Sequence, residues 1–548
     1  MERRLIVAIV LSFVVLFAYQ AIFMKKKPET EVIRPVSGNV VQKVEPEAQE
    51  AIASPAPTQG QAAETKTPSR PVAAPGEEEI SIDTSLFQAV WSNRGAVLKS
   101  WKIKKHRDEV REPLELVSKN AAETKKYPFA LRTEDQAFND LVNFAFYKPS
   151  SSSLQLKDGE KAEVRFEYAD DKNSRVEKTF IFQGGNYEFQ VKIEAWKNGQ
   201  AIDAGVLWGP GIGNPSAAEL KQRVGAAGGG IAVYTSNSVY RVNERKYNPQ
   251  QSAYNFATWA AYEDNYFAAL FLMPEQKGSA VFLRDAKDNL AYFYLAVTRP
   301  QQVFIGPKEF DLVRKLGLGT KGLMNFGFFG PITEVLLVTI KSVHKVVPNW
   351  GIAIIILTLI IKIIFFPLTY SSTKSMSKMQ ELQPKIKALR AKYKKAKQDI
   401  NQRRQMNEEM MRLYKEHGIN PAGGCLPLLI QIPVFWGYFR MFTVAIEFRK
   451  APFLLWIKDL SIKDPYYITP ILMGVTQYIS QKMTPTSADP SQAKMMLIMP
   501  FVFTIFFMNF QSGLVLYWLT NNVLQIGQQA IMNNLMKKKK REEHGKRR

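Results

Sequence analysis

The stretch from Trp350 to Tyr370, WGIAIIILTLIIKIIFFPLTY, constrains the fold of this chain more than any other segment. A membrane-spanning helix needs about 20 apolar residues at a rise of 1.5 Å per residue, and this run supplies them. Lys362 lies among its isoleucines. Because a lysine near the centre of a span costs roughly 2.5–3.5 kcal/mol on insertion scales, such a charge usually faces a polar cavity or a partner. Thr358 lies one turn earlier on the same helix face. The alternative interpretation is that Lys362 only extends its amine to the near interface.

Positive charge is concentrated in two segments. The 548-residue chain has a net charge of +23; residues 371–421 hold 13 Lys and Arg against 5 Asp and Glu, and residues 537–548 hold 8 against 2. A basic excess beside apolar helices indicates the cytoplasmic side of a membrane, and it also suits nucleic acid or anionic lipid. The single cysteine, Cys425, excludes an internal disulfide, and the four histidines lack metal-ligand spacing. We therefore expect no cofactor.

The first 78 residues are predicted to form a membrane anchor and a linker. Within residues 1–27 the apolar run Leu5–Met24 follows Arg3 and Arg4 and lacks the small-residue cleavage site of a secretory signal. This pattern indicates an uncleaved transmembrane signal anchor with its N-terminus in the cytoplasm. Residues 28–78 hold eight prolines and few large apolar residues, a composition that favours a disordered linker.

Residues 79–330 follow a period of two. Tyr187–Glu194 alternates polar and apolar residues and follows Lys178–Phe182 across the turn Gln183–Asn186, which predicts a β-hairpin. Further strands are predicted at Ala89–Trp91, Val97–Ile103, Ser279–Arg284, Ala291–Val297 and Val303–Ile305. Many short strands with Gly, Asn and Asp turns predict a large periplasmic antiparallel β-sandwich. Because no paired-carboxylate spacing stands out, a structural or docking role is favoured over a sugar-binding cleft.

Helical segments flank the Lys362 run on both sides. Residues 331–349 are predicted to form an amphipathic helix in the membrane interface, or a last helix packed on the sandwich. Residues 350–370 form the span itself. Residues 371–421 are predicted to form a basic cytoplasmic helical hairpin, with Pro384 bending its first arm. The apolar seams of its two arms are Met379, Leu382, Ile386, Leu389 and Tyr393, and then Ile400, Met410, Met411 and Tyr414.

The basic side chains of this hairpin are candidates for contact with the ribosome or with anionic lipid head groups. The alternative is a solvated charged face that only fixes the topology. The candidate residues are Lys385, Lys387, Arg390, Lys394, Lys395, Arg403 and Arg404.

Residues 422–536 contain four more apolar runs, which brings the predicted number of spans to six. The runs are Leu426–Ile446, Tyr466–Met483, Met495–Phe510 and Leu514–Met536. An even number of spans puts both termini on one side, and the basic tail at 537–548 indicates that this side is the cytoplasm.

The last run carries a polar stripe. Asn521, Gln525 and Gln528 or Gln529 recur at helical spacing, and Gln431 and Gln477 add single amides to earlier runs. Amides in lipid need partners or water. They either bond helix to helix or line a wet cavity together with Lys362 and Thr358.

Six stretches resemble the YidC family of bacterial membrane protein insertases, which is related to the Oxa-type insertases of organelles. They are NWGIAIIILTLIIK, FFPLT, LQPKIKALR, NPAGGCLPLLIQIPVFWGYF, APFLLWIKDLSIKDPYYITPILMG and SGLVLYWLTNN. They cover most of the chain from Asn349 to Met536 in the family's order and spacing. The anchor, linker and β-rich region resemble the long Gram-negative form of the family by their layout.

The resemblance implies a five-helix core around a hydrophilic groove that is open to the cytoplasm and to lipid and closed outward. A positive charge in this groove receives polar or acidic parts of a nascent chain. The family usually has Arg there, and the matching residue here is Lys362. Lysine loses its proton more readily when buried, whereas arginine stays ionised and binds in a fork; a wet groove would keep Lys362 charged. Thr358, Tyr517 and Trp518 match groove-facing positions, and Asn521, Gln525 and Gln431 complete the candidate site.

The same resemblance implies partners for the other regions. The hairpin corresponds to cytoplasmic loops that contact the ribosome or the signal-recognition machinery. The β-rich region resembles the family's periplasmic super-sandwich, which is associated with the Sec translocon and its accessory proteins. No DNA partner is expected.

We therefore predict an inner-membrane insertase and chaperone for nascent membrane proteins that uses no covalent catalysis. No GxxxxGK[ST] loop occurs, so no ATPase is indicated. One alternative is a secondary transporter whose substrate meets Lys362, although no internal repeat is evident. Another is a membrane-anchored periplasmic enzyme acting on glycans, which the polar residues in the later apolar runs disfavour.

Overall fold

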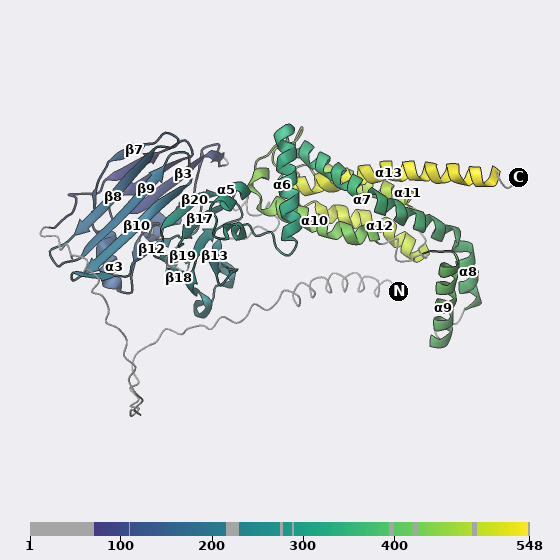
Figure 1. The fold of residues 1–548 in the computed structure, drawn as a ribbon, viewed down its shortest axis with the longest axis horizontal. Coiled ribbons are helices and arrows are strands. Elements are labelled where there is room, and N and C mark those ends of the chain that lie inside the picture. The colour runs from purple at the N-terminus through teal and green to yellow at the C-terminus, as the bar shows by residue number, and fades with distance from the viewer. Residues whose placement is uncertain are drawn as a thin grey trace, which may run out of the picture.

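The computed structural model describes residues 71–108, 110–214, 229–274, 278–287, 290–393, 399–419, 426–484 and 490–545, of which residues 426–429, 490–495 and 536–545 are described by their backbone. A β domain and a helical region follow one another along the longest axis (Figure 1). The predicted anchor and most of the predicted linker lie outside the described residues. Near the end of the linker, Val72 pairs with Ala169, so this part of the linker joins the β domain.

Three sheets build the β domain. In order of pairing, the first contains β4 (Pro113–Glu115), β3 (Val97–Arg107), β2 (Phe87–Ser92), β1 (Glu79–Asp83) and β7 (Ser153–Gln155). The second contains β14 (Ser238–Asn243), β13 (Gly230–Thr235), β16 (Trp259–Glu263), β17 (Phe267–Leu272), β20 (Gln302–Pro307), β10 (Glu188–Lys197), β9 (Arg175–Gln183), β8 (Lys161–Ala169) and β6 (Lys148–Pro149), with β11 (Gln200–Ile202) on β10. The third contains β15 (Ala253–Ala257), β18 (Gly278–Lys287), β19 (Leu290–Thr298), β12 (Gly205–Trp208) and β5 (Leu131–Arg132).

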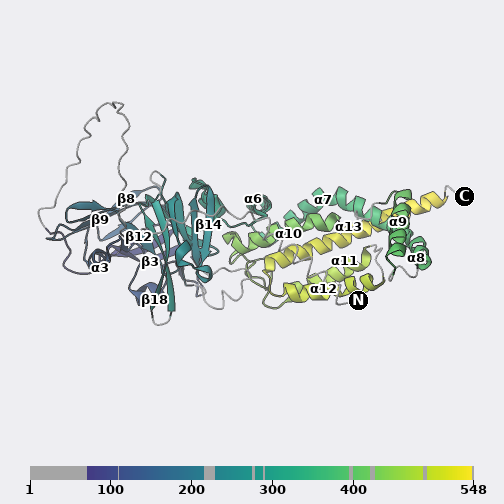
Figure 2. The ribbon, with the colours of Figure 1, turned by 90° about the horizontal axis from the view of Figure 1, so that it is seen from below.

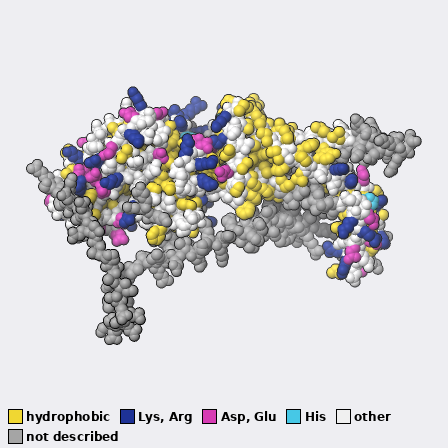
Figure 3. Space-filling view, in the orientation of Figure 1, with side chains coloured by type: hydrophobic (Ala, Val, Ile, Leu, Met, Phe, Trp, Pro, Cys, Tyr) yellow, Lys and Arg dark blue, Asp and Glu magenta, His cyan; other side chains and the backbone are white. Residues whose placement is uncertain are grey.

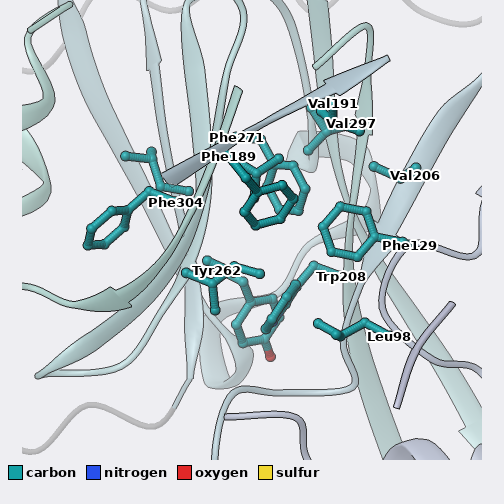
Figure 4. Packing of buried hydrophobic residues seen from close by; sticks show 14 of the residues in the cluster. Leu98, Phe129, Phe189, Val191, Val206, Trp208, Tyr262, Phe271, Val297 and Phe304 are labelled. Carbon is teal, nitrogen blue, oxygen red and sulfur yellow. The ribbon is translucent and has the colours of Figure 1, made fainter. Parts of the chain in front are cut away.

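Alternation along the strands explains how these sheets pack. In β9 every second side chain is buried, because successive residues of a strand point to opposite faces. Trp91 of the first sheet packs on Phe180 of the second, with ring centroids 4.2 Å apart. Phe129 contacts both Trp208 of the third sheet and Phe271 of the second (Figure 4). The outer sheets thus share one apolar core with the long central sheet.

The β prediction is confirmed at the level of a β-rich sandwich. The predicted hairpin is the β9–β10 pair, in which Phe182 faces Phe189. The other predicted strands fall within β2, β3, β18, β19 and β20. One difference is that β1 pairs with β7 in parallel, which a prediction from hairpins along the chain could not include.

Helices occupy the rest of the described chain. The β domain contains α2 (Asn120–Thr124), α3 (Gln136–Phe144) and the single turns η1 (Glu244–Lys246) and η2 (Pro249–Gln251), and it ends in α5 (Phe310–Lys315) and η3 (Thr320–Leu323). The helical region contains α6 (Gly330–Val346), α7 (Trp350–Glu381), α8 (Gln383–Lys392), α9 (Ile400–Glu416), α10 (Leu426–Val444), η5 (Ile446–Phe448), α11 (Ile468–Met483), α12 (Pro490–Phe507) and α13 (Ser512–Gly545). Figures 1 and 2 show α7, α10, α11, α12 and α13 running side by side.

Two helices continue beyond the predicted spans. The helix that begins at Trp350 does not end at Tyr370, where the predicted span ends, because α7 continues through Pro367 to Glu381. Beside Pro367, the hydroxyl of Thr369 donates to the carbonyl of Phe365 (3.0 Å), and the segment that follows has no glycine that would end a helix. The last helix likewise continues beyond Met536 to Gly545. The predicted interruption at Pro384 is present, since α7 gives way to α8 at Leu382.

The hairpin seam is only partly as predicted. Met379, Leu382 and Ile386 are buried together with Ile419, and Met410, Leu413 and Tyr414 pack against them. Ile400 and Met411 were expected in the second seam, but they are 81% and 48% exposed. Because α8 and α9 pack mainly near their junction with α7, the first turn of α9 has no described apolar partner.

Among the described residues, α7 is the one helix that is long and apolar enough to cross a membrane by length and composition. Only 28% of its most apolar 18-residue window is buried, unlike a helix in the core of a soluble protein. Residues 496–507, the part of α12 whose side chains are described, are also apolar.

Helix α6 lies across the end of the bundle that faces the β domain (Figure 1). Its buried residues Leu336, Leu337 and Ile340 belong to one cluster with residues of α7 and α10. The helix therefore packs on the bundle through these residues, while Phe310, Met324 and Phe326 from the end of the β domain belong to the same cluster.

Polar contacts fix the β domain to this end of the bundle. The ammonium of Lys341 in α6 lies 3.0 Å from Glu447 of η5 and 2.8 Å from Asp311 of α5. Beyond η5, the amine of Lys450 donates to the carbonyl of Arg107 in β3 (2.9 Å). Ile446 belongs to the core cluster of the β domain. The segment after α10 is thus part of both regions.

Candidate functional site: a polar cavity in the helical bundle

A cavity of about 270 Å³ lies between α7, α10, α11 and α13. All seven residues of the predicted groove line it, although they come from three helices that are far apart in the sequence. These residues are Thr358 and Lys362 of α7, Gln431 of α10, and Tyr517, Trp518, Asn521 and Gln525 of α13.

Lys362 is the one charged side chain among the described residues that line the cavity. Its amine donates a hydrogen bond to the side-chain carbonyl of Gln525 (Nζ–Oε1 2.7 Å). No carboxylate in the described part of the chain forms an ion pair with it. Because an ammonium has three donors and an amide brings no negative charge, this environment orients the charge without neutralising it.

Hydrogen bonds between and within helices hold the polar wall in place. The indole N–H of Trp518 donates to the side-chain oxygen of Gln477 in α11 (3.2 Å). The amide of Asn522 donates to the backbone carbonyl of Met473 in the same helix (3.1 Å). Thr358 donates to the carbonyl of Ile354 (2.7 Å). The amide of Asn522 therefore joins two helices, as one of the two alternatives for the polar stripe predicted. The amide of Gln525 instead accepts a hydrogen bond from Lys362.

The two ends of the cavity differ. Towards the β domain, the rings of Tyr517 and Tyr438 stack with centroids 4.0 Å apart, and the apolar cluster that contains Leu357, Phe442 and Leu514 follows. Towards the hairpin, the lining continues to Met376 of α7 and Thr484, directly after α11. From Thr358 to Met376 the helix rises about 27 Å, so the polar lining extends along much of α7.

Several lining residues were missed by the sequence analysis. On α7 they are Thr369, Ser372 and Thr373, and on α11 or directly after it they are Ser480 and Thr484. Gln477 of α11, which the sequence analysis named beside Gln431, does line the cavity. On α7 these positions continue the helical spacing of Thr358 and Lys362, and this spacing would have identified them if the span had not been ended at Tyr370. Gln528 and Gln529 of the predicted stripe are not among the lining residues; the amide of Gln529 bonds Asn533 on its own helix (2.9 Å).

The predicted basic contact residues lie apart from the cavity, on α8 and α9. Lys385, Lys387, Arg390, Arg403 and Arg404 are all exposed. Arg404 pairs with Glu408 (3.0 Å), and the amine of Lys385 lies 3.2 Å from a ring nitrogen of His417. Lys394 and Lys395 fall outside the described residues.

No group of three or more His, Cys, Asp or Glu side chains with metal-binding geometry occurs within the described ranges. The cavity itself offers one amine, several amides and hydroxyls, and aromatic rings. This set can bind and orient a polar or anionic segment by hydrogen bonds and charge.

Fold and site together define a class: a membrane-associated protein in which a large β domain is fixed to a helical bundle with a charged polar cavity. Comparison with known families agrees with this division. Residues 342–540 match the family described as "60Kd inner membrane protein", and residues 79–339 match the "YidC periplasmic domain".

Relatives match over nearly the whole length. The membrane protein insertase YidC of Syntrophus aciditrophicus is 37% identical over 97% of this chain and 99% of its own length. That of Citrifermentans bemidjiense is 38% identical over the same shares. A crystal structure described as an active YidC insertase with its first transmembrane domain resolved is 21% identical, covers 83% of this chain and 93% of its own, and has a TM-score of 0.36. The chain belongs to the YidC family of membrane protein insertases, and these relatives favour neither the transporter nor the glycan enzyme.

Proposed function

We propose that this protein inserts newly made membrane proteins into the inner membrane and assists their folding, using the cavity around Lys362 to receive the polar part of the client. The observation that carries this proposal is an ammonium group inside a polar cavity, paired with an amide and with no described carboxylate. A cavity built in this way leaves the positive charge available to an acidic or polar segment.

The bundle is proposed to span the membrane with the β domain in the periplasm and both termini in the cytoplasm. Six spans are proposed: the N-terminal anchor, α7, α10, α11, α12 and α13. Figure 3 shows hydrophobic side chains gathered over the bundle, between the charged β domain and the charged hairpin. Helix α6, with Val335 and Val338 exposed, is proposed to lie in the periplasmic interface.

The proposed work is a lowered barrier for a short translocated segment. A charged residue at the centre of a bilayer costs about 2.5–3.5 kcal/mol on insertion scales, and hydrogen bonds with the cavity replace part of the lost hydration.

The exposed basic residues of α8 and α9 are proposed to meet the ribosome or anionic head groups, because both surfaces carry negative charge that attracts Lys and Arg. A contact of the β domain with the Sec translocon and its accessory proteins is also proposed. Both proposals rest on the family resemblance and on charge, and they are separate from the role of the cavity.

Insertion into liposomes that contain only this purified protein tests the proposal. The client is a single-spanning protein with a short acidic translocated end, and protease protection of that end is measured. Lys362→Ala is expected to reduce protection about tenfold, equivalent to about 1.4 kcal/mol, while Lys362→Arg preserves it because the charge remains. Lys374→Ala is the matched control, since Lys374 lies exposed on the same helix and does not line the cavity.

Full insertion by a stable Lys362→Ala protein would remove the electrostatic role of the cavity. An absence of insertion by the wild type would mean that a partner is obligatory.

A further inference from the structure

The loop between α10 and α11 presents two adjacent leucines to the outside. Leu454 is 55% exposed and Leu455 is 84% exposed. They occupy a closed turn in which the backbone N–H of Phe453 donates to the carbonyl of Ile457 (2.9 Å) and that of Ile457 donates to the carbonyl of Leu454 (3.1 Å). Leu455 has a φ of 53°, a conformation that glycine or asparagine adopts more easily. A leucine at this position indicates a requirement for an apolar side chain.

The turn is anchored to the beginning of α7. The side-chain amide of Asn349 donates to the carbonyl of Phe453 (3.1 Å), while its oxygen accepts the N–H of Ile352 and caps the helix (3.0 Å). The ring of Phe453 lies so close to Gly351 that a Cβ there would be 2.0 Å from it. These contacts hold the two leucines level with the first turn of the most apolar helix.

A second anchor lies on the other side of the turn. Asp464 is fully buried and accepts hydrogen bonds from the indole N–H of Trp456 (3.2 Å) and from the N–H and hydroxyl of Thr469 in α11 (2.8 and 2.6 Å). The turn is therefore held between α7 and α11, and its outward direction is a fixed property of the fold.

We infer that Leu454 and Leu455 insert into the membrane leaflet on the side of the β domain, at the boundary between head groups and acyl chains. The occupant of this surface is lipid because the turn is anchored at the first turn of α7, and the first turn of a span lies at that boundary. Further along the same helix, Leu359, Ile363 and Ile364 are exposed apolar residues that would face acyl chains in the proposed bundle. The exposed Tyr466 at the start of α11 suits the same level, where aromatic residues are enriched.

This lipid contact secures the outward end of the bundle. The same loop continues from the segment that contacts both Lys341 and the β domain. Two leucines held in the leaflet thus fix the depth of that junction in the membrane. The inference rests on the membrane-spanning bundle proposed above.

Spin-label depth measurements on the full chain in vesicles of phosphatidylethanolamine and phosphatidylglycerol test this inference. Cys425 is the only cysteine of the chain, so Cys425→Ser provides the background for Leu455→Cys, for Leu454→Cys as a second position, and for two controls. Lys458→Cys is the aqueous control, since Lys458 is exposed in the same loop. Ile364→Cys is the lipid control.

Labels at positions 454 and 455 are expected to collide more often with oxygen than with a water-soluble nickel complex, which corresponds to a depth of about 5–10 Å. The label at position 458 is expected to collide more often with the nickel complex. Equal access of the nickel complex to positions 455 and 458 would overturn the inference. Exclusion of both reagents from position 455 would also overturn it, in favour of a contact with a second copy of the chain. Access of the nickel complex to position 364 would instead show that the proposed span is wrong. This control therefore distinguishes a failure of the proposed membrane-spanning bundle from a failure of the inference about the two leucines.

Discussion

The β domain and the helical bundle each enclose a lysine that has no described carboxylate partner, and they treat its charge in opposite ways. Lys178 of β9 is fully buried, and its amine donates to the carbonyls of Gly95 (2.6 Å), Ala96 (3.2 Å) and Phe129 (2.8 Å). Three acceptors match the three donors of an ammonium. Lys362 has one described acceptor, Gln525, and faces a cavity.

This difference separates a structural charge from one that is available to a ligand. At Lys178 the fold supplies every partner, so the lysine joins a turn of the first sheet and the Phe129 segment to the central sheet. At Lys362 the fold orients the ammonium through Gln525 and leaves its other N–H groups available to a ligand. Burial of a charge therefore indicates a binding function only where its partners are incomplete.

The largest effect is expected from Lys178→Ala. The substitution leaves buried carbonyls without a donor, and each unsatisfied group costs about 1–3 kcal/mol, so the free energy of unfolding should fall by at least about 3 kcal/mol. This loss of unfolding free energy is measured by unfolding the full chain in denaturant, with the protease resistance of the β domain as the readout. The insertion activity of the folded fraction should be unchanged. A loss below about 1 kcal/mol would contradict the structural role, since that is the size of one ordinary hydrogen bond.

The next effect is a pH dependence of stability that originates at Lys178. Burial lowers the pKa of this amine to about 7, whereas the unfolded chain keeps a pKa of about 10.4. Between these values the unfolded state binds the extra proton, so stability should rise with pH by up to about 1.4 kcal/mol per pH unit. This contribution is fully present above about pH 10.4 and is lost as the pH falls to about 7. The difference between wild type and Lys178→Met across this range isolates the contribution, and parallel curves would disprove it.

A smaller effect is expected from a change beside Lys362. Gln525→Glu would place a carboxylate where the amide oxygen now lies 2.7 Å from the amine. The internal ion pair should compete with acidic client segments and reduce their insertion about tenfold, equivalent to about 1.4 kcal/mol. Gln525→Leu removes the hydrogen bond without adding charge and should cost only about threefold. Equal insertion by the Glu and Leu variants would show that client charge is not what the cavity recognises.

The smallest effect is expected from Lys362→Met on stability. Because the fold provides one described partner, removal of the charge should change the free energy of unfolding by no more than about 0.5 kcal/mol, or increase it slightly. Chemical unfolding in detergent, compared with Lys178→Met under the same conditions, measures the contrast. A loss as large as that of Lys178→Met would make Lys362 structural as well, and the comparison between the two lysines would fail.

The sequence predicted features that depend on neighbouring residues. The period of two located the β9–β10 hairpin, and in the structure Lys178, Phe180 and Phe182 lie on the same buried strand face. Helical spacing put Thr358 and Lys362 on one face of α7. It did not reveal that α7 continues beyond Tyr370 to Glu381, because the end of an apolar run marks the end of a span, whereas hydrophobicity and backbone conformation are separate properties.

What the sequence alone determined is thus the class of each segment: a β-rich domain, apolar helices, a charge among isoleucines and the motifs of an insertase family. Only the tertiary structure decided which partners each lysine meets. Gln525 lies 163 residues from Lys362, and the carbonyl of Phe129 lies 49 residues from Lys178. The physical reason is that periodicity fixes the face on which a side chain lies, whereas the packing of distant elements fixes what is opposite that face and how much of a charge remains unsatisfied.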